Sequence, residues 1–163
     1  MSREAAAVRR ASVDSDHDVR ALAELRFVWR HDEEGEQGEL DSFGPAFTEW
    51  CAARAGTHVA FLGEVDGRVV GMAWLGILTR IPGPERFRRL SGIVQSVYVR
   101  PEARGHGLGG ALVDAVVAYA RQRGLDYLAV HPSELSYPVY ERAGFAPTRS
   151  VLELGLTEPR RPA

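Results

Sequence analysis

The sequence predicts a single α/β domain with a mixed β-sheet, and three observations support this fold class. Segments rich in β-branched residues alternate with segments whose apolar residues recur at helical spacing. Two strand-like segments flank Asp66-Gly67, a dipeptide typical of tight hairpins. A further strand, ending at Val99, turns through a glycine-rich loop directly into a helix. With 163 residues, the chain has room for one domain and a sizeable core.

The expected order of elements is β-α-α-β-β-β-α-β-α-β. Ser15 and its acidic neighbours can cap the first helix, and Pro101 should end the strand before the glycine-rich loop. The expected helices follow the cap at 14–16, follow Ser42, cover about 107–123 and begin near Tyr137; the expected strands cover 8–11, 59–65, 68–78, 92–99, 127–130 and 151–156.

Composition excludes several classes of protein. Hydrophobic residues make up 45% of the chain and charged residues 26%, as in ordinary soluble domains. The net charge of -2 and the pI near 6.2 provide no basic field for binding nucleic acid. Cys51 is the only cysteine, so neither an intrachain disulfide nor a metal-thiolate cluster can form, and no metal site is predicted. The sequence lacks a secretory leader pattern and a long apolar run, which predicts a cytoplasmic protein without membrane contact.

The most informative segment is the loop from Arg104 to Gly110. Four glycines within the six residues 105–110 let the backbone approach a ligand. Their N–H groups lie at the positive end of the helix that follows, where an anion binds favourably, and Arg104 supplies a charged partner. The loop is therefore predicted to hold phosphate.

Two common phosphate-binding motifs fit this loop poorly. Residues 105–110 match the dinucleotide pattern G-x-G-x-x-G, but that motif normally opens the first strand-helix unit of its fold. Here about 100 residues precede the motif. In the dinucleotide fold, an acidic residue that binds the ribose lies at the end of the second strand, about 20 residues further on. Asp126 is at roughly that distance, but it lies at the beginning of its strand. The phosphate-binding loop of P-loop NTPases is excluded because no Gly-Lys-Ser/Thr follows the glycines.

A third interpretation accounts for two motifs together. The run Val-x-Pro-x-x-Arg-Gly-x-Gly-x-Gly over 99–109 resembles the acetyl-CoA pyrophosphate loop of the GNAT superfamily of N-acetyltransferases. Downstream, Tyr140-Glu141-Arg142-Ala143-Gly144-Phe145 is similar to the family's Tyr-x-x-x-Gly-Phe segment. The resemblance covers about residues 7–155 of a single domain, 1–163.

The resemblance implies a sheet with helices on both faces and two splayed central parallel strands, here those ending at Val99 and Val130. The pantetheine arm of acetyl-CoA would enter the splay and bond the backbone of the first strand. It implies that the cofactor contacts Val97, Tyr98, Val99, Arg104, Gly105, His106, Gly107, Leu108, Gly109, Gly110, Ser133 and Tyr140. Ser133 departs from the family, which often has asparagine at that position.

The resemblance also assigns catalytic roles. Tyr140 matches the residue that protonates the departing thiolate, and the Val97 N–H matches the donor that polarises the thioester carbonyl. Gln95 occupies the position of a glutamate that many members use as base, and an amide cannot act as one. Gln95 either orients the acceptor or a water, or is only a satisfied strand residue. The base is left open among Glu134, His131 and the acids of 32–41.

The predicted function is transfer of an acetyl group from acetyl-CoA to a primary amine by direct attack in a ternary complex. The acidic segment 32–41 suggests an acceptor wall for a cationic amine, with a solvated loop as the alternative interpretation. A homodimer is possible. The alternatives are a regulatory module that binds acyl-CoA without catalysis and a peptide or protein N-terminal acetyltransferase.

Overall fold

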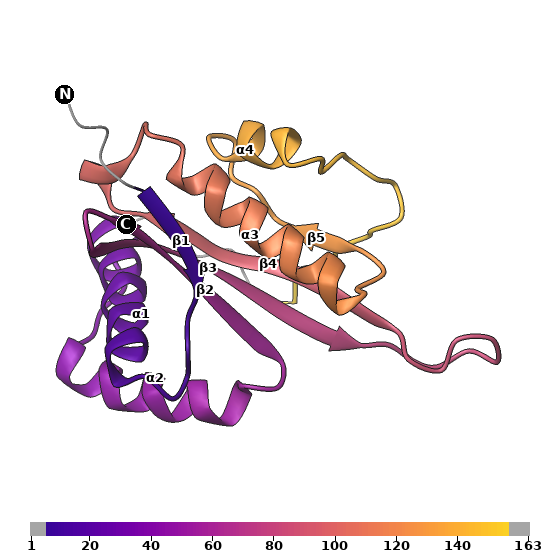
Figure 1. The fold of residues 1–163 in the computed structure, drawn as a ribbon, viewed down its shortest axis with the longest axis horizontal. Coiled ribbons are helices and arrows are strands. Elements are labelled where there is room, and N and C mark those ends of the chain that lie inside the picture. The colour runs from indigo at the N-terminus through magenta and orange to yellow at the C-terminus, as the bar shows by residue number, and fades with distance from the viewer. Residues whose placement is uncertain (1–5, 157–163) are drawn as a thin grey trace.

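A five-stranded mixed sheet organises the protein, whose residues 6–156 are described by a computed structural model (Figure 1). The sheet follows the chain order β1-β2-β3-β4-β5. Neighbouring strands are antiparallel from β1 to β4, and β4 and β5 are parallel, so the predicted mixed sheet is confirmed. The strands are β1 (Ala6–Arg10), β2 (His58–Val65), β3 (Arg68–Thr79), β4 (Leu90–Val99) and β5 (Leu128–Val130).

Helices cover both faces of the sheet, as predicted. The helices are α1 (Asp16–Val28), α2 (Leu40–Arg54), α3 (Leu108–Arg123) and α4 (Tyr137–Arg142). One buried cluster packs α1 and α2 against the sheet, and a second packs α3 and α4 against the opposite face (Figure 1). Strand β3 is buried on both faces: Leu75 contributes to the α3 cluster and Trp74 to the α1 cluster. None of the described helices is both long enough and apolar enough to cross a membrane.

The two parallel strands splay apart. Strand β5 pairs only with Gly92, Ile93 and Val94, after which β4 runs on to Val99 without it. The ladder between β4 and β3 is also irregular here, because Ser96 and Val97 have no register partner on β3. Ser96 has a positive φ of 52°, which is unusual for a residue with a side chain. The splay and the bulge leave backbone polar groups of β4 available to a ligand.

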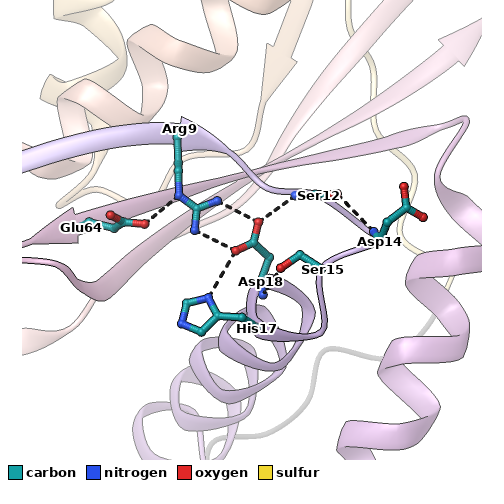
Figure 2. A network of polar contacts seen from close by, with 7 residues as sticks. All are labelled: Arg9, Ser12, Asp14, Ser15, His17, Asp18 and Glu64. Atoms are coloured by element: carbon teal, nitrogen blue, oxygen red, sulfur yellow. Dashed lines mark hydrogen bonds and ion pairs between the residues drawn. The ribbon is translucent and has the colours of Figure 1, made fainter.

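A buried carboxylate fixes α1 against β1 (Figure 2). Asp18 is 4% exposed and accepts two hydrogen bonds from the Arg9 guanidinium, at 2.7 and 2.8 Å. It also accepts the Ser12 backbone N–H at 2.9 Å. The Arg9 guanidinium holds the pKa of Asp18 well below its usual range, since it favours the ionised carboxylate. Ser15 accepts the Asp18 N–H as the predicted N-cap of α1.

Two expectations about the elements were wrong, and one element was not foreseen. Residues 151–156 form no strand: their apolar residues alternate with others, but no described strand pairs with them, and Leu152 is 97% exposed. The second helix begins at Leu40 with Glu39 as its N-cap, so Ser42 lies within its first turn. A π-helical turn, Trp29–Glu33, extends α1 and was not foreseen. Such turns depend on tertiary packing and have no strong local sequence pattern.

Candidate active site

The predicted phosphate loop lies between the end of β4 and the start of α3. A short 3₁₀ turn, Pro101–Ala103, follows β4 as the proline predicted. Gly105 and Gly107 adopt left-handed conformations, with φ of 83° and 84°, and Gly107 is the N-cap of α3. A Cβ atom placed on either glycine would meet nothing within 4 Å. The loop therefore presents open backbone at the positive end of a helix.

Leu108 fixes the position of this loop. Its side chain is 3% exposed and lies in the buried cluster beneath α3. A Cβ atom on Gly63 of strand β2 would approach the Leu108 side chain to 3.0 Å, so a larger residue there would push against the loop. The absence of a side chain at Gly63 lets the start of α3 lie close to the sheet.

Arg104 connects the loop to the π-helical turn. Its Nε donates to the Val99 carbonyl at 2.8 Å, and its Nη2 donates to the Glu33 carboxylate at 2.9 Å. The Tyr98 hydroxyl also donates to Glu33, at 2.9 Å, and burial together with this contact raises the pKa of Tyr98 to about 12. The direct pairing of Arg104 with phosphate stays a prediction. The ion pair with Glu33 is half-exposed, which makes it weak enough for a phosphate to replace it.

On the face of the sheet opposite α3, a cavity of about 380 Å³ opens between α1, α2 and the sheet. Aromatic rings form much of its lining, and we call it the aromatic cavity. Gln95 and Ser96 form its floor on β4. Arg26 of α1 donates to Ser96 Oγ at 2.9 Å, and its guanidinium lies 5.2 Å from the centre of the Trp29 ring. Burial lowers the pKa of Arg26. The residues that line the cavity are Arg26, Phe43, Ala46, Phe47, Trp50, Trp74, Gln95 and Ser96.

His58 contacts Trp50, one of the residues that line this cavity, and the sequence analysis did not single it out. Its ring meets Trp50 edge-on at 4.9 Å. A Cβ atom on Gly76 would lie 3.5 Å from Gln95 Nε2 and 3.7 Å from His58 Nε2, so the two side chains converge above that glycine. Burial and the nearby Arg54 lower the pKa of His58, which keeps the imidazole neutral at neutral pH. No local motif marks this histidine, because the fold alone brings it towards β4.

Comparison with known proteins identifies the family. Residues 18–145 match the model of the acetyltransferase (GNAT) family. The chain belongs to this family. It is 37% identical over 138 residues to mycothiol acetyltransferase of Salinispora tropica, and this match covers 81% of the chain and 42% of that protein. It is 34% identical over 96 residues to glucosamine 6-phosphate N-acetyltransferase of Trypanosoma brucei brucei, covering 59% of the chain and 63% of that protein.

Solved structures agree with this assignment at the level of the fold. The structure superposes on a predicted acetyltransferase of Clostridium acetobutylicum crystallised with acetyl-CoA, with a TM-score of 0.73 and 23% identity, covering 96% of this chain and 100% of that one. The chain spans less than half the length of the mycothiol acetyltransferases and 63% of the glucosamine 6-phosphate enzyme.

Within this GNAT fold, Tyr140 lies in the short helix α4. Its side chain is 7% exposed and packs edge-on against Phe145 at 5.5 Å. Burial raises its pKa, so the phenol is protonated at neutral pH. No described residue forms a hydrogen bond with its hydroxyl. Ser133 accepts the Ser136 backbone N–H at 3.3 Å and donates to Ser136 Oγ at 3.0 Å, so it organises the turn before α4.

The candidate bases from the sequence lie away from the cavity lining. Glu134 is exposed on the turn between β5 and α4. His131 is also exposed and pairs with Glu153 at 3.1 Å. Neither residue is among those that line the aromatic cavity.

Much of the charge in the acidic segment 32–41 is compensated. Glu34 and Glu36 both accept from Arg30, and Glu33 accepts from Arg104. Asp32 lies 2.8 Å from a ring nitrogen of His31. The expected attraction of this segment for a cationic acceptor is therefore weaker than its composition indicates.

Proposed function

We propose that the protein is an acetyl-CoA-dependent N-acetyltransferase that acetylates a primary amine in a ternary complex. The observation that carries the proposal is the open glycine loop at the start of α3, placed directly after the end of β4 that no longer pairs with β5. Backbone N–H groups of residues 104–110 bind the pyrophosphate, and the segment 97–99 bonds the pantetheine as an added strand. The open loop and the bulged strand fit this ligand, and the proposal covers the whole chain as one domain.

The acceptor amine approaches from the aromatic cavity. Its nitrogen attacks the thioester carbonyl, a C–N bond forms, and the C–S bond breaks to leave an amide and the thiolate of coenzyme A. The Val97 N–H stabilises the oxyanion, supported by its position in the bulge of β4. The protonated phenol of Tyr140 gives its proton to the departing sulfur. No covalent enzyme intermediate is needed.

The amine must lose a proton during the reaction, and we assign this proton to His58, through water held near Gln95. A neutral imidazole can accept a proton, and the lowered pKa of His58 keeps it neutral across the physiological range. His58→Gln should reduce kcat and remove the acid limb of the pH profile, whereas His17→Gln, on the surface of α1, should change neither. An unchanged acid limb in His58→Gln would exclude the assignment.

Release of coenzyme A from acetyl-CoA in the presence of an amine panel tests the activity. The panel contains amino acids, amino sugars, polyamines and peptides, and isothermal calorimetry measures acetyl-CoA binding in parallel. Release with one class of amine supports an N-acetyltransferase, and a preference for peptides identifies the N-terminal alternative. Binding of acetyl-CoA without release for any amine would favour a regulatory module.

A further inference from the structure

We infer that the acceptor is a primary amine that carries an anionic group and an apolar face. This inference rests on the proposed function, because it identifies the class of substrate that the aromatic cavity admits. The anion binds Arg26, and the apolar face lies against the rings of α2 and β3. Aromatic α-amino acids fit this description with the amine next to the anion; amino sugar phosphates combine the same groups with the amine farther from the anion.

The first argument is the charge of the cavity. Of the eight residues that line it, all of them described, Arg26 is the charged one, and the remaining polar groups are Gln95 and Ser96. Among the described residues, no carboxylate forms an ion pair with Arg26. Its guanidinium carries more N–H donors than its single bond to Ser96 uses. A half-buried cation gains most from an anionic partner, since burial removes the hydration that would otherwise stabilise its charge.

The charged groups around Arg26 leave this preference in place. Arg30 adds positive charge from the next turn of the helix, while Glu34 and Glu36 act on Arg26 in the opposite sense. Both glutamates also accept from Arg30. Neither glutamate lines the aromatic cavity, so the charge that faces a ligand there is the Arg26 guanidinium.

The second argument is the shape and composition of the wall. Phe47 packs edge-on against Trp74 and lies 5.9 Å from Trp50, so the three rings form one connected surface. Trp50 is 38% exposed and therefore available for contact. Such a surface binds a flat aromatic ring or the apolar face of a sugar. The positive charge of Arg26 beside it disfavours a polyamine, which carries the same charge.

The third argument is the distance between the anion site and the reacting centre. Arg26 bonds Ser96, which directly precedes Val97, the proposed oxyanion donor. When the anion of a ligand is bound at Arg26, the ligand atoms next to that anion lie beside the bulge of β4. An amine close to the anion reaches the thioester, as in an α-amino acid, while the rest of the molecule lies along the aromatic wall.

Matched acceptors test the inference. We would compare L-phenylalanine with phenethylamine, which lacks only the carboxylate, and glucosamine 6-phosphate with glucosamine, using spermidine as a cationic control. In each pair the anionic member should show a kcat/KM at least about 10-fold higher, the effect of a charge-assisted hydrogen bond. The better of the two pairs then identifies carboxylate or phosphate as the anion.

Variants link the preference to Arg26. Arg26→Gln should reduce the difference within the preferred pair to about 2-fold or less, while Arg20→Gln, on the exposed side of α1, should keep it. Circular dichroism and acetyl-CoA binding check that each variant is folded. A wild-type enzyme that prefers phenethylamine, glucosamine or spermidine would overturn the inference.

The two proposals fail in different ways. If no amine is acetylated, the proposed activity is wrong, and calorimetric binding of each acceptor pair still tests the site. Tighter binding of the anionic members, lost in Arg26→Gln, would support the inference even then. Equal binding within both pairs would refute it.

Discussion

The glycine loop and the aromatic cavity flank the same strand, β4, but the chain builds them in different ways. The loop is seven consecutive residues, 104–110, that offer backbone N–H groups. The cavity combines side chains from α1, α2, β3 and β4, and its bond between Arg26 and Ser96 joins residues 70 positions apart. A cofactor common to a whole family can be bound by backbone, whereas the choice of acceptor needs side chains that differ between members.

The largest effect on kcat should come from a change in the acetyl-transfer step, which needs both the bound cofactor and the bound acceptor. Tyr140→Phe keeps the ring and its packing on Phe145 and removes only the hydroxyl. Loss of a general acid should lower kcat by about 100- to 10,000-fold. Acetyl-CoA affinity and melting temperature should remain close to wild type. The exposed Tyr137 of the same helix provides the control, since Tyr137→Phe should leave kcat unchanged; near-normal turnover in Tyr140→Phe would exclude the catalytic role.

A second variant separates the loop from the cavity. Gly107→Asp adds bulk and negative charge where the loop meets the pyrophosphate, and it strains a residue with φ of 84°. Acetyl-CoA affinity should fall by about 100-fold, the effect of roughly 2.7 kcal/mol. Acceptor binding, measured by calorimetry, should persist.

A control must separate the backbone strain at position 107 from the effect on acetyl-CoA binding. Gly124, at the other end of α3, is also left-handed, with φ of 71°, and also has open space around it. Gly107→Ala and Gly124→Ala should therefore lose similar stability, while only substitutions at 107 weaken acetyl-CoA binding. Wild-type affinity in a folded Gly107→Asp protein would show that the loop does not hold the pyrophosphate.

The same contrast explains what the sequence could reveal. The strand, the proline stop, the glycine run and the start of α3 were all predictable, because each depends on neighbours in the chain. Arg26 and His58 could not be assigned, since their significance arises only when the sheet brings Gln95 and Ser96 beside them. The prediction of a strand at 151–156 was wrong for a related reason: alternating apolar residues form a strand only beside a partner strand.

A third prediction concerns the framework that holds both sites. Asp18→Asn removes the charge that two Arg9 hydrogen bonds depend on, and should reduce the free energy of unfolding by about 1.5–3 kcal/mol. Because the pKa of Asp18 is lower in the folded than in the unfolded chain, its contribution is complete above about pH 5 and is lost as the pH falls. The difference between wild type and variant should therefore shrink from pH 7 to pH 3.

Urea unfolding followed by fluorescence measures this difference. Asp14 is the matched control, because its side chain points away from the network that Figure 2 shows. Asp14→Asn should change stability by less than about 0.5 kcal/mol at either pH. A pH-independent loss in Asp18→Asn would mean that packing, and not the ionised carboxylate, stabilises this corner.

The smallest effect should reveal whether the acceptor side and the loop are coupled. Glu33→Gln removes the carboxylate that pairs with Arg104 while its amide oxygen can still accept from the Tyr98 hydroxyl. Freed from an exposed ion pair worth about 0.2–1 kcal/mol, Arg104 should bind the pyrophosphate more readily, and the Kd for acetyl-CoA should fall by about 1.4- to 5-fold. The gain should shrink at high salt, and Glu34→Gln, whose partner is Arg30, should show none. A Kd that rises in Glu33→Gln would instead mean that Glu33 holds Arg104 in its binding position, so that the ion pair supports cofactor binding and does not compete with it.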